Sequence, residues 1–191
     1  QTAEALGQVN RALASTLDPN ELLGVILEEL ARVVPSDSCS ILLLKEDHLQ
    51  VVAARGFSPE TTAEVLKLRF PSGPGTVDHR AIASGRPLLL ADVRQDPEWR
   101  DFAPSGEIRS WLGVPLMARG QAAGVLGIIG RRPGQFTAAH AEAAEAFAGQ
   151  AALALDNARL YSDLLAQLRQ MTVLNEVARV LSSTIEREEL L

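Results

Sequence analysis

Cysteine and histidine are scarce in this chain, which has one cysteine, Cys39, and three histidines among 191 residues. A single cysteine excludes a disulfide within the chain and any zinc site built from several cysteines. The histidines His48, His79 and His140 are scattered along the sequence and form no metal-ligand spacing. The sequence therefore predicts no metal centre, and its lone thiol fits the reducing cytoplasm.

Excess positive charge and long apolar runs are also missing. The formal net charge is -6, and Arg131-Arg132 is the only adjacent basic pair. A nucleic-acid partner would need a basic stripe on one face. The longest run of apolar residues and glycine, 122–130, falls far short of the roughly 20 residues that a membrane helix needs. No signal peptide is visible. We expect a cytoplasmic chain with no nucleic-acid partner and no membrane segment.

Catalytic motifs are absent as well. The sequence has no glycine-rich phosphate loop ending in Lys-Ser or Lys-Thr, and no His-Glu-x-x-His pair. Asp78 and His79 are neighbours on a predicted helix, so their side chains diverge. We therefore expect a protein that is not an enzyme. Apolar residues make up 47% of the chain, which is enough to bury a sizeable core.

Apolar periodicity divides the chain into helices and short strands. Helical spacing or capping residues predict helices at 2–14, 18–35, 58–66, 76–84 and 137–182. Runs rich in β-branched and apolar residues predict strands at 38–45, 48–55, 87–93, 110–118 and 122–131. The short links at 46–47 and 119–121 require antiparallel neighbours. The order predicts an α+β fold with an antiparallel sheet flanked by helices and a long C-terminal helix.

Two strand residue types need an explanation. Gly124, Gly127 and Gly130 occur at every third position of the last predicted strand. Glycine in a strand marks a close approach of backbone, a bulge, or space left for a ligand, and the sequence leaves these alternatives open. Pro115 within the preceding strand indicates a sheet edge or a bulge.

The two ends of the chain resemble each other. Residues 6–23 and 174–191 align without gaps and share nine of eighteen residues, including the Ser-Thr pair and the Glu-Leu-Leu that follows. Together with Gln1 as first residue, the match favours a section of a longer protein that enters a second copy of the same domain. We expect an N-terminal helix or linker at 1–17, one domain at 18–161, and a connecting coiled-coil helix at 162–191.

Several motifs in fixed order resemble the GAF domain family. They are CSILLL at 39–44, GPGTV at 73–77, RSWLGVPL at 109–116, GVLG at 124–127, Phe136-Thr137, and LDNARLY at 155–161. The resemblance covers residues 6–161. It implies a six-stranded antiparallel sheet with a small-molecule pocket on one face. It also implies a sensor role in bacterial signalling, and with the matching ends we expect the first domain of a tandem pair.

By this resemblance, the pocket is lined by residues from the first strand, the loop and helix near residue 76, the long loop at 94–108, and the late strand. Four aromatic residues, Phe70, Trp99, Phe102 and Trp111, are set either to roof such a cavity or to fill the core. The candidate pocket residues are Ser40, Leu42, Phe70, Thr76, Val77, His79, Arg94, Trp99, Phe102, Ile108 and Gly127. Free backbone N–H groups at the helix start near Thr76 favour an anionic ligand group.

The known ligand classes of the family fit poorly. Cyclic-nucleotide members carry Asn-Lys, Phe and Asp-Glu, whereas this chain has Arg131-Arg132, Phe136 and His140-Ala141. Covalent bilin needs a cysteine in the loop-helix region, and Cys39 is on the first strand. Methionine sulfoxide reduction needs a second thiol. Haem-binding members place a histidine before RSWLGVP, where this chain has none, so haem would need His79. The cofactor stays unknown.

The last predicted helix carries an apolar seam with alternating spacings of four and three. Its positions are Leu153, Asn157, Leu160, Leu164, Gln167, Met171, Leu174, Ala178 and Leu181. This pattern is typical of a coiled coil, in which polar Asn157 and Gln167 set the register. We expect a homodimer through the N- and C-terminal helices that carries a ligand signal to an effector domain, such as a histidine kinase, a diguanylate cyclase or a phosphatase. The alternative is a ligand-free dimerisation and transmission scaffold.

Overall fold

The computed structural model of the chain describes residues 19–101 and 107–188, with side chains described within 21–101 and 107–171. A six-stranded antiparallel sheet forms the centre of the first of two structural units, Gln1–Ala154 and Leu155–Leu191. The predicted helix at 2–14, Phe102, and the side chains of Leu174, Ala178 and Leu181 lie outside the described parts. Of the matching ends of the chain, residues 1–18 and 189–191 and the side chains of 174–188 also lie outside the described parts.

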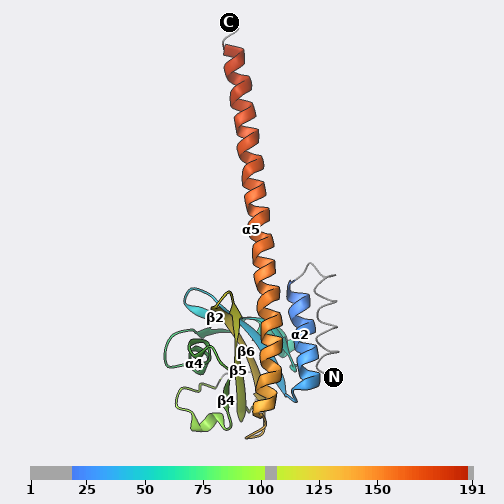
Figure 1. The fold of residues 1–191 in the computed structure, drawn as a ribbon, viewed down its shortest axis with the longest axis vertical. Coiled ribbons are helices and arrows are strands. Elements are labelled where there is room, and N and C mark those ends of the chain that lie inside the picture. Colours follow the sequence, from blue (N-terminus) through green and yellow to red (C-terminus); the bar gives the residue numbers. More distant parts are fainter. Residues whose placement is uncertain (1–18, 102–106, 189–191) are drawn as a thin grey trace. The chain divides into compact units, whose positions relative to one another are not determined.

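The sheet has the strand order β3-β2-β1-β6-β5-β4. Its strands are β1 (Ser38–Leu44), β2 (His48–Arg55), β3 (Arg69–Pro71), β4 (Leu88–Leu90), β5 (Ser110–Ala118) and β6 (Gln121–Gly130). The long strands β1 and β6 are central, and β3 and β4 are short edge strands (Figure 1). The β5–β6 turn uses positive φ angles at Arg119 and Gly120, 52° and 79°, which suits the twist of a two-residue hairpin.

One face of the sheet is packed by α2 (Pro19–Val33) and by the beginning of α5 (Ala138–Glu188) (Figure 1). From α2, Leu23, Ile26, Leu27 and Leu30 are almost fully buried. From α5, the large ring of Phe147 is buried among small buried alanines. Alternation along the strands turns Ile41, Leu112, Leu126 and Ile128 to this side, and all are buried. We call it the packed face.

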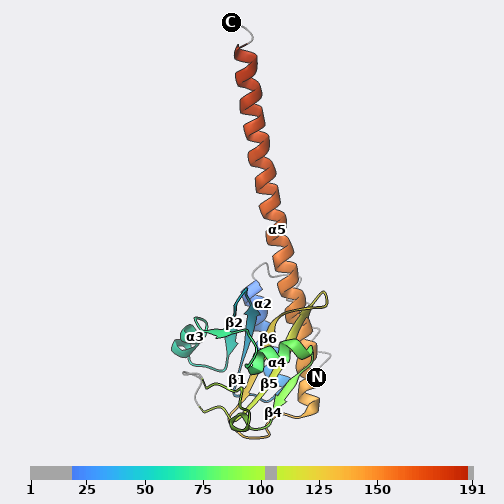
Figure 2. The same cartoon turned by 90° about the vertical axis from the view of Figure 1, so that its left-hand side faces the viewer.

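The opposite face carries two shorter helices, α3 (Pro59–Val65) and α4 (Val77–Ser84) (Figure 2). Each begins with a capping hydroxyl: Ser58 Oγ accepts from the Thr61 N–H, and Thr76 Oγ1 accepts from the His79 N–H. Gly85 ends α4 in the left-handed conformation with φ 63°. These helices bury few residues, namely Val65, Val77 and Ala81. We call this side the cavity face.

The second unit contains the remainder of α5. Its described side chains include large exposed apolar residues: Leu160 is 46% exposed, Leu164 51% and Met171 63%. Leu153, at the end of the first unit, is 51% exposed, although its neighbours Ala152 and Ala154 are buried. The predicted seam positions that the structure describes are therefore open to solvent in a single chain. Whether they form a dimer interface stays a prediction.

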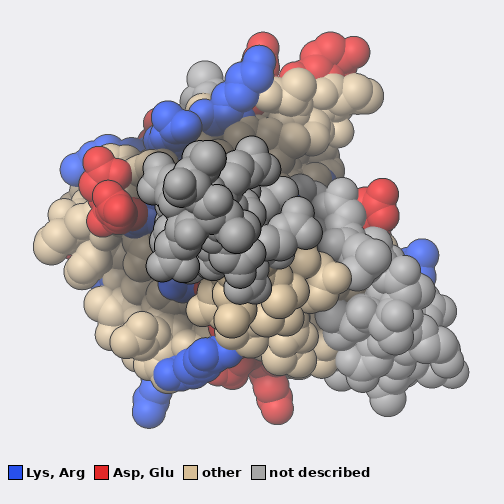
Figure 3. All heavy atoms as spheres, turned by 90° about the horizontal axis from the view of Figure 1, so that it is seen from above, with Lys and Arg blue, Asp and Glu red and all other residues tan. Residues whose placement is uncertain are grey.

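Charges of both signs occupy the surface. On the face drawn in Figure 3, basic and acidic side chains both lie along the rim, and neither sign gathers into one patch among the described residues. None of the described helices combines the length and apolar character that crossing a membrane requires.

The fold confirms the predicted α+β class with a six-stranded antiparallel sheet and a long C-terminal helix. The helix predicted to begin at Asp18-Pro19 does begin at Pro19, and Asp18 itself is outside the described residues. Strand β3 is missing from the strands predicted along the sequence, because three residues carry too little pattern. The predicted strand at 87–93 is shortened to β4, after which Val93–Gln95 forms a 3-10 turn, η1.

Pro115 lies next to both features that the sequence indicated, a sheet edge and a bulge. Strand β4 pairs with β5 only as far as Gly113, so Pro115 lies where β5 is bonded to β6 on one side. A register irregularity follows between Leu116 and Met117. A residue without a backbone N–H is tolerated at such a position.

Candidate ligand cavity

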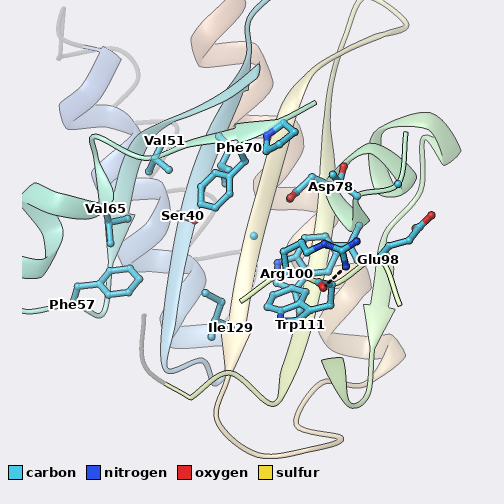
Figure 4. A pocket seen from close by; sticks show the side chains of 17 residues that line it. Ser40, Val51, Phe57, Val65, Phe70, Asp78, Glu98, Arg100, Trp111 and Ile129 are labelled. Carbon is cyan, nitrogen blue, oxygen red and sulfur yellow. Dashed lines mark hydrogen bonds between the residues drawn. The ribbon is translucent and has the colours of Figure 1, made fainter. Parts of the chain in front are cut away.

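A cavity of about 180 Å³ lies on the cavity face, between the sheet and the segments that cover it. Strands β1, β2, β5 and β6 supply one wall, and α3, β3, the start of α4 and the segment 98–100 supply the others (Figure 4). The lining residues are Ser40, Leu42, Val51, Phe57, Val65, Phe70, Pro71, Gly75, Thr76, Val77, Asp78, Glu98, Trp99, Arg100, Trp111, Gly127 and Ile129. The lining is thus mostly apolar, with a few polar and charged groups.

Glycine makes room for the cavity in the sheet. Gly127 on β6 pairs with Ser40 on β1 and with Gly113 on β5. A Cβ atom at Gly127 would point into the cavity, 3.3 Å from Trp111 Nε1 and 3.7 Å from Ser40 Oγ. A Cβ atom at Gly113 would overlap the Trp111 ring. Gly113 therefore seats the Trp111 ring flat against β5, and Gly127 leaves open the space beside it.

The two tryptophans of the chain meet at this cavity. The ring centroids of Trp99 and Trp111 are 6.1 Å apart and their planes are inclined by 59°. Trp99 Nε1 donates a 3.0 Å hydrogen bond to Asp101 Oδ1, which orients its ring. Both rings line the cavity, so together they form an aromatic corner rather than a parallel stack.

Ion pairs hold residues 92–101 in place as a covering segment. Arg80 of α4 pairs with Asp96 and, at 3.1 Å, with Glu98. At the base of the segment, Arg109 pairs with Asp92 at 2.9 Å. The Arg109 hydrogen bond, followed by one from the Arg94 N–H, lowers the pKa of Asp92. The segment is thereby attached both to α4 and to the beginning of β5.

The start of α4 contributes a carboxylate to the cavity. Asp78 lies in the first turn, directly after Thr76 and Val77, which also line the wall. Burial raises the pKa of Asp78 from 3.8 to about 6, against a smaller opposing effect of its own backbone N–H. Since Thr76 Oγ1 already accepts from the His79 N–H at 3.2 Å, the protein's own groups occupy much of this helix end. This weakens the expectation that an anionic ligand group binds here.

A family model described as a GAF domain matches residues 16–156. The chain belongs to the GAF domain family. Its sequence is 30% identical over 127 residues to the Nif-specific regulatory protein of Azospirillum lipoferum, and the match covers 63% of this chain. The chain spans only about a fifth of that relative, since the match covers 20% of it. This GAF domain thus has a homologue within a larger regulatory protein.

Solved structures show the same fold. The GAF domain of a phosphoenolpyruvate-protein phosphotransferase from Coxiella burnetii superposes with a TM-score of 0.72 at 20% identity, covering 85% of this chain and 96% of that one. A free methionine-R-sulfoxide reductase from Neisseria meningitidis superposes with a TM-score of 0.69 at 23% identity, covering 84% and 91%. At these identities the similarity concerns the fold, which regulatory domains and an enzyme share.

Seven of the eleven candidate pocket residues lie along the cavity of this GAF domain. They are Ser40, Leu42, Phe70, Thr76, Val77, Trp99 and Gly127. That they bind a ligand stays a prediction. Trp111, considered at first as either roof or core, lines the cavity and is also almost fully buried.

Three other candidates do not line the cavity. Arg94 is exposed and pairs with Glu107 at 2.6 Å. His79 is half-buried on α4, on a helix whose cavity-lining residues are Val77 and Asp78. Ile108 is buried in the apolar cluster beneath the cavity. The family resemblance placed all three near the pocket. Instead, the side chain of Arg94 forms an ion pair, that of His79 lies towards the surface, and that of Ile108 packs in the core. Phe102 lies outside the described residues.

Sequence reasoning missed the charged residues of the cavity, Asp78, Glu98 and Arg100, and also Phe57. Asp78 had a usable signal: an apolar residue and a cap precede it at a helix start, so the first turn was expected to face the pocket. Glu98 and Arg100 flank Trp99, which was predicted, but an irregular segment has no periodicity from which to predict side-chain direction.

The thiol of the GAF domain lies away from the cavity. Cys39 neighbours the cavity residue Ser40 on β1 and so faces the packed side. Burial raises its pKa to about 12, with Arg55 and Glu28 as lesser influences. The thiolate, which is the reactive form, is therefore strongly disfavoured. Within residues 19–101 and 107–188, no group of three or more His, Cys, Asp or Glu side chains is arranged to hold a metal ion.

Proposed function

We propose that this GAF domain is a regulatory sensor module that binds a small molecule in the cavity and passes the signal through α5 to a downstream effector domain. The observation that carries the proposal is the cavity that is lined by Gly127, Trp99 and Trp111. A domain that served only as a scaffold would gain packing energy by filling this space. The homologous Nif-specific regulatory protein supports a regulatory role.

The mechanism couples the cavity to the helix by differential affinity. A ligand that prefers one arrangement of α4 and segment 92–101 shifts the domain towards that arrangement, typically by about 1–3 kcal/mol. Strands β5 and β6 contact α4 on one side, and β6 is followed by residues 131–137 and then by α5. We infer that α5 pairs with its copy in a parallel homodimer and transmits the change. The effector, whether histidine kinase, diguanylate cyclase or phosphatase, and a cytoplasmic location belong to the proposal.

The exposed side of α5 supports this transmission role. At 100° per residue, Leu153 points away from the buried alanines 148 and 151 of the same helix. The same spacing continues through Leu160, Leu164 and Met171, which are all exposed. A stripe of large apolar side chains open to water favours a partner helix.

A regulatory role is also favoured over catalysis. The one thiol is buried with a pKa of about 12, which opposes the thiol chemistry of a methionine sulfoxide reductase. The ligand-free scaffold remains the second candidate. It is supported by the exposed helical seam, since pairing of two helices would need no ligand.

Native mass spectrometry of the purified chain, before and after denaturation, tests the main proposal. We expect a dimer that carries or can be loaded with a small molecule released on denaturation. A dimer that stays empty after exposure to a metabolite extract would favour the scaffold.

Replacing both Asn157 and Gln167 by Leu should strengthen dimerisation, because polar seam positions reduce coiled-coil stability. Unchanged dimer affinity would contradict the parallel seam.

A further inference from the structure

The charges around the cavity are unequally paired. Arg100 donates from Nη1 to the backbone carbonyl oxygens of Pro97, at 2.7 Å, and Trp99, at 2.9 Å. Glu98 lies 3.1 Å from Arg80 Nη1. Asp78 forms no ion pair among the described residues, and the one group that stabilises its charge is its own backbone N–H. In Figure 4, Asp78, Glu98 and Arg100 lie on one side of the cavity, and Val65 and Phe57 lie on the other. Hydrogen bonds to carbonyl oxygens leave the positive charge of Arg100 in place, so the lining carries two carboxylates, Asp78 and Glu98, against one guanidinium, and its net charge is negative.

The remaining wall is aromatic. Phe57, Phe70, Trp99 and Trp111 supply four rings to one small cavity. The faces of aromatic rings carry negative electrostatic potential, so they attract cations, with tryptophan the strongest. The inclined pair Trp99–Trp111 presents two ring surfaces at an angle, which suits a group that enters between them better than a flat stack would.

The same wall opposes an anion. A ligand carboxylate or phosphate would meet the ionised Asp78 in a space with little water, where like charges repel strongly. The desolvation that raises the pKa of Asp78 to about 6 is the penalty of an unpaired charge, and a bound cation would relieve it. Glu98 and Arg100 from the covering segment are the other charged groups on the wall.

We propose that the cavity recognises a small organic cation, an ammonium group on an apolar or aromatic body, with Asp78 as its counter-ion and the Trp99–Trp111 corner around it. This inference rests on the proposed sensor function and specifies its ligand class. The volume of about 180 Å³ limits the body to roughly one ring with a short arm, since a cavity of about 150 Å³ holds benzene.

Three probes of matched shape and different charge test the proposal on the whole 191-residue chain. They are phenethylammonium, 2-phenylethanol and phenylacetate. The fluorescence of the two tryptophans reports binding directly, because both rings line the cavity. We expect phenethylammonium to bind about tenfold or more tightly than 2-phenylethanol, and phenylacetate to bind most weakly.

Two variants locate the charge. Asp78→Asn should weaken phenethylammonium about ten- to a hundredfold, because it removes a charged hydrogen-bond partner, and should leave 2-phenylethanol nearly unchanged. Glu46→Gln removes the same charge from the exposed turn between β1 and β2 and should change neither. Between pH 7 and pH 5, phenethylammonium affinity should fall about tenfold as Asp78, with a pKa of about 6, takes up a proton.

The outcomes separate the two proposals. Tighter binding of phenylacetate or 2-phenylethanol would overturn the cationic ligand and leave the sensor function standing. Equal loss in Asp78→Asn and Glu46→Gln would overturn the role of Asp78. If none of the probes changes the fluorescence, the ligand class is wrong unless native mass spectrometry releases a cationic molecule from the purified chain. A cavity empty in both experiments would overturn the sensor function as well.

Discussion

The two faces of the sheet are built from the same strands but are covered in different ways. On the packed face, α2 alone buries Leu23, Ile26, Leu27 and Leu30 almost completely, and α5 adds Phe147. On the cavity face, α3 buries one residue and α4 buries two, of which Ala81 is small. Alternation along each strand supplies both faces, so the coverage rather than the sheet decides where a cavity forms. One face is closely packed and the other keeps a cavity.

Aromatic truncation gives the largest expected contrast between the faces. Phe147→Ala should cost about 3–5 kcal/mol of unfolding free energy, because it leaves a void within close packing. Phe57→Ala, on the wall of the existing cavity, should cost less than about 1.5 kcal/mol because the site is half-buried and already open. Urea denaturation followed by circular dichroism measures both. Equal losses would mean that the two faces are packed alike.

Two glycines three residues apart on β6 sharpen the contrast. A Cβ atom at Gly124 would overlap the backbone carbonyl of Leu42, which cannot move without breaking the sheet. Gly124→Ala should therefore cost about 1–3 kcal/mol. Gly127→Ala places its methyl 3.3 Å from Trp111 Nε1, a side-chain atom at the cavity that can shift by a few tenths of an ångström, and should cost less than about 1 kcal/mol. A larger loss of stability for Gly127→Ala than for Gly124→Ala in urea denaturation would contradict the directions assigned to the two Cβ atoms.

Asp78→Asn should show a small effect with the opposite sign. The folded-state Asp78 pKa of about 6 exceeds the ordinary 3.8, so the folded chain binds the proton more tightly, and the contribution of Asp78 to stability falls as the pH rises from 4 through 6. At pH 7, Asp78→Asn should stabilise the domain by about 1–2 kcal/mol, after allowance for partial exposure. The gain should shrink towards pH 4 in urea denaturation at both values. A destabilised variant at pH 7 would show that Asp78 has a partner.

The packed face was the more predictable one. The stripe of Leu22, Leu23, Ile26, Leu27 and Leu30 has helical period, and each of its members is buried. Strands β1, β2, β5 and β6 were evident from residue type, and the caps at Ser58, Thr76 and Gly85 from turn chemistry. A periodic pattern shows which side chains of an element face the core and which face solvent, and packing depends on this distinction.

The cavity face was less predictable, because its walls come from short or irregular segments. Neither the short strand β3 nor the irregular segment that contains Glu98 and Arg100 has a periodic sequence pattern. Arg94 and His79 were placed by family position, but Arg94 binds Glu107 instead, a pairing over thirteen residues that local pattern does not reveal. The sequence also left open why glycine occurs within β6, and the structure answers this. Gly124 lies where the backbone of β1 approaches closely, and Gly127 lies on the cavity wall beside Trp111.

Hydrogen–deuterium exchange of the ligand-free chain tests the central comparison most directly. Exchange resolved by peptide reports local opening, which is rare where many apolar side chains are buried. The account predicts slow exchange in α2, β1 and β6, and exchange faster by at least about tenfold in α3, α4 and segment 92–101. Equal protection of α4 and α2 would contradict it, because the cavity face would then be as rigidly packed as the face opposite.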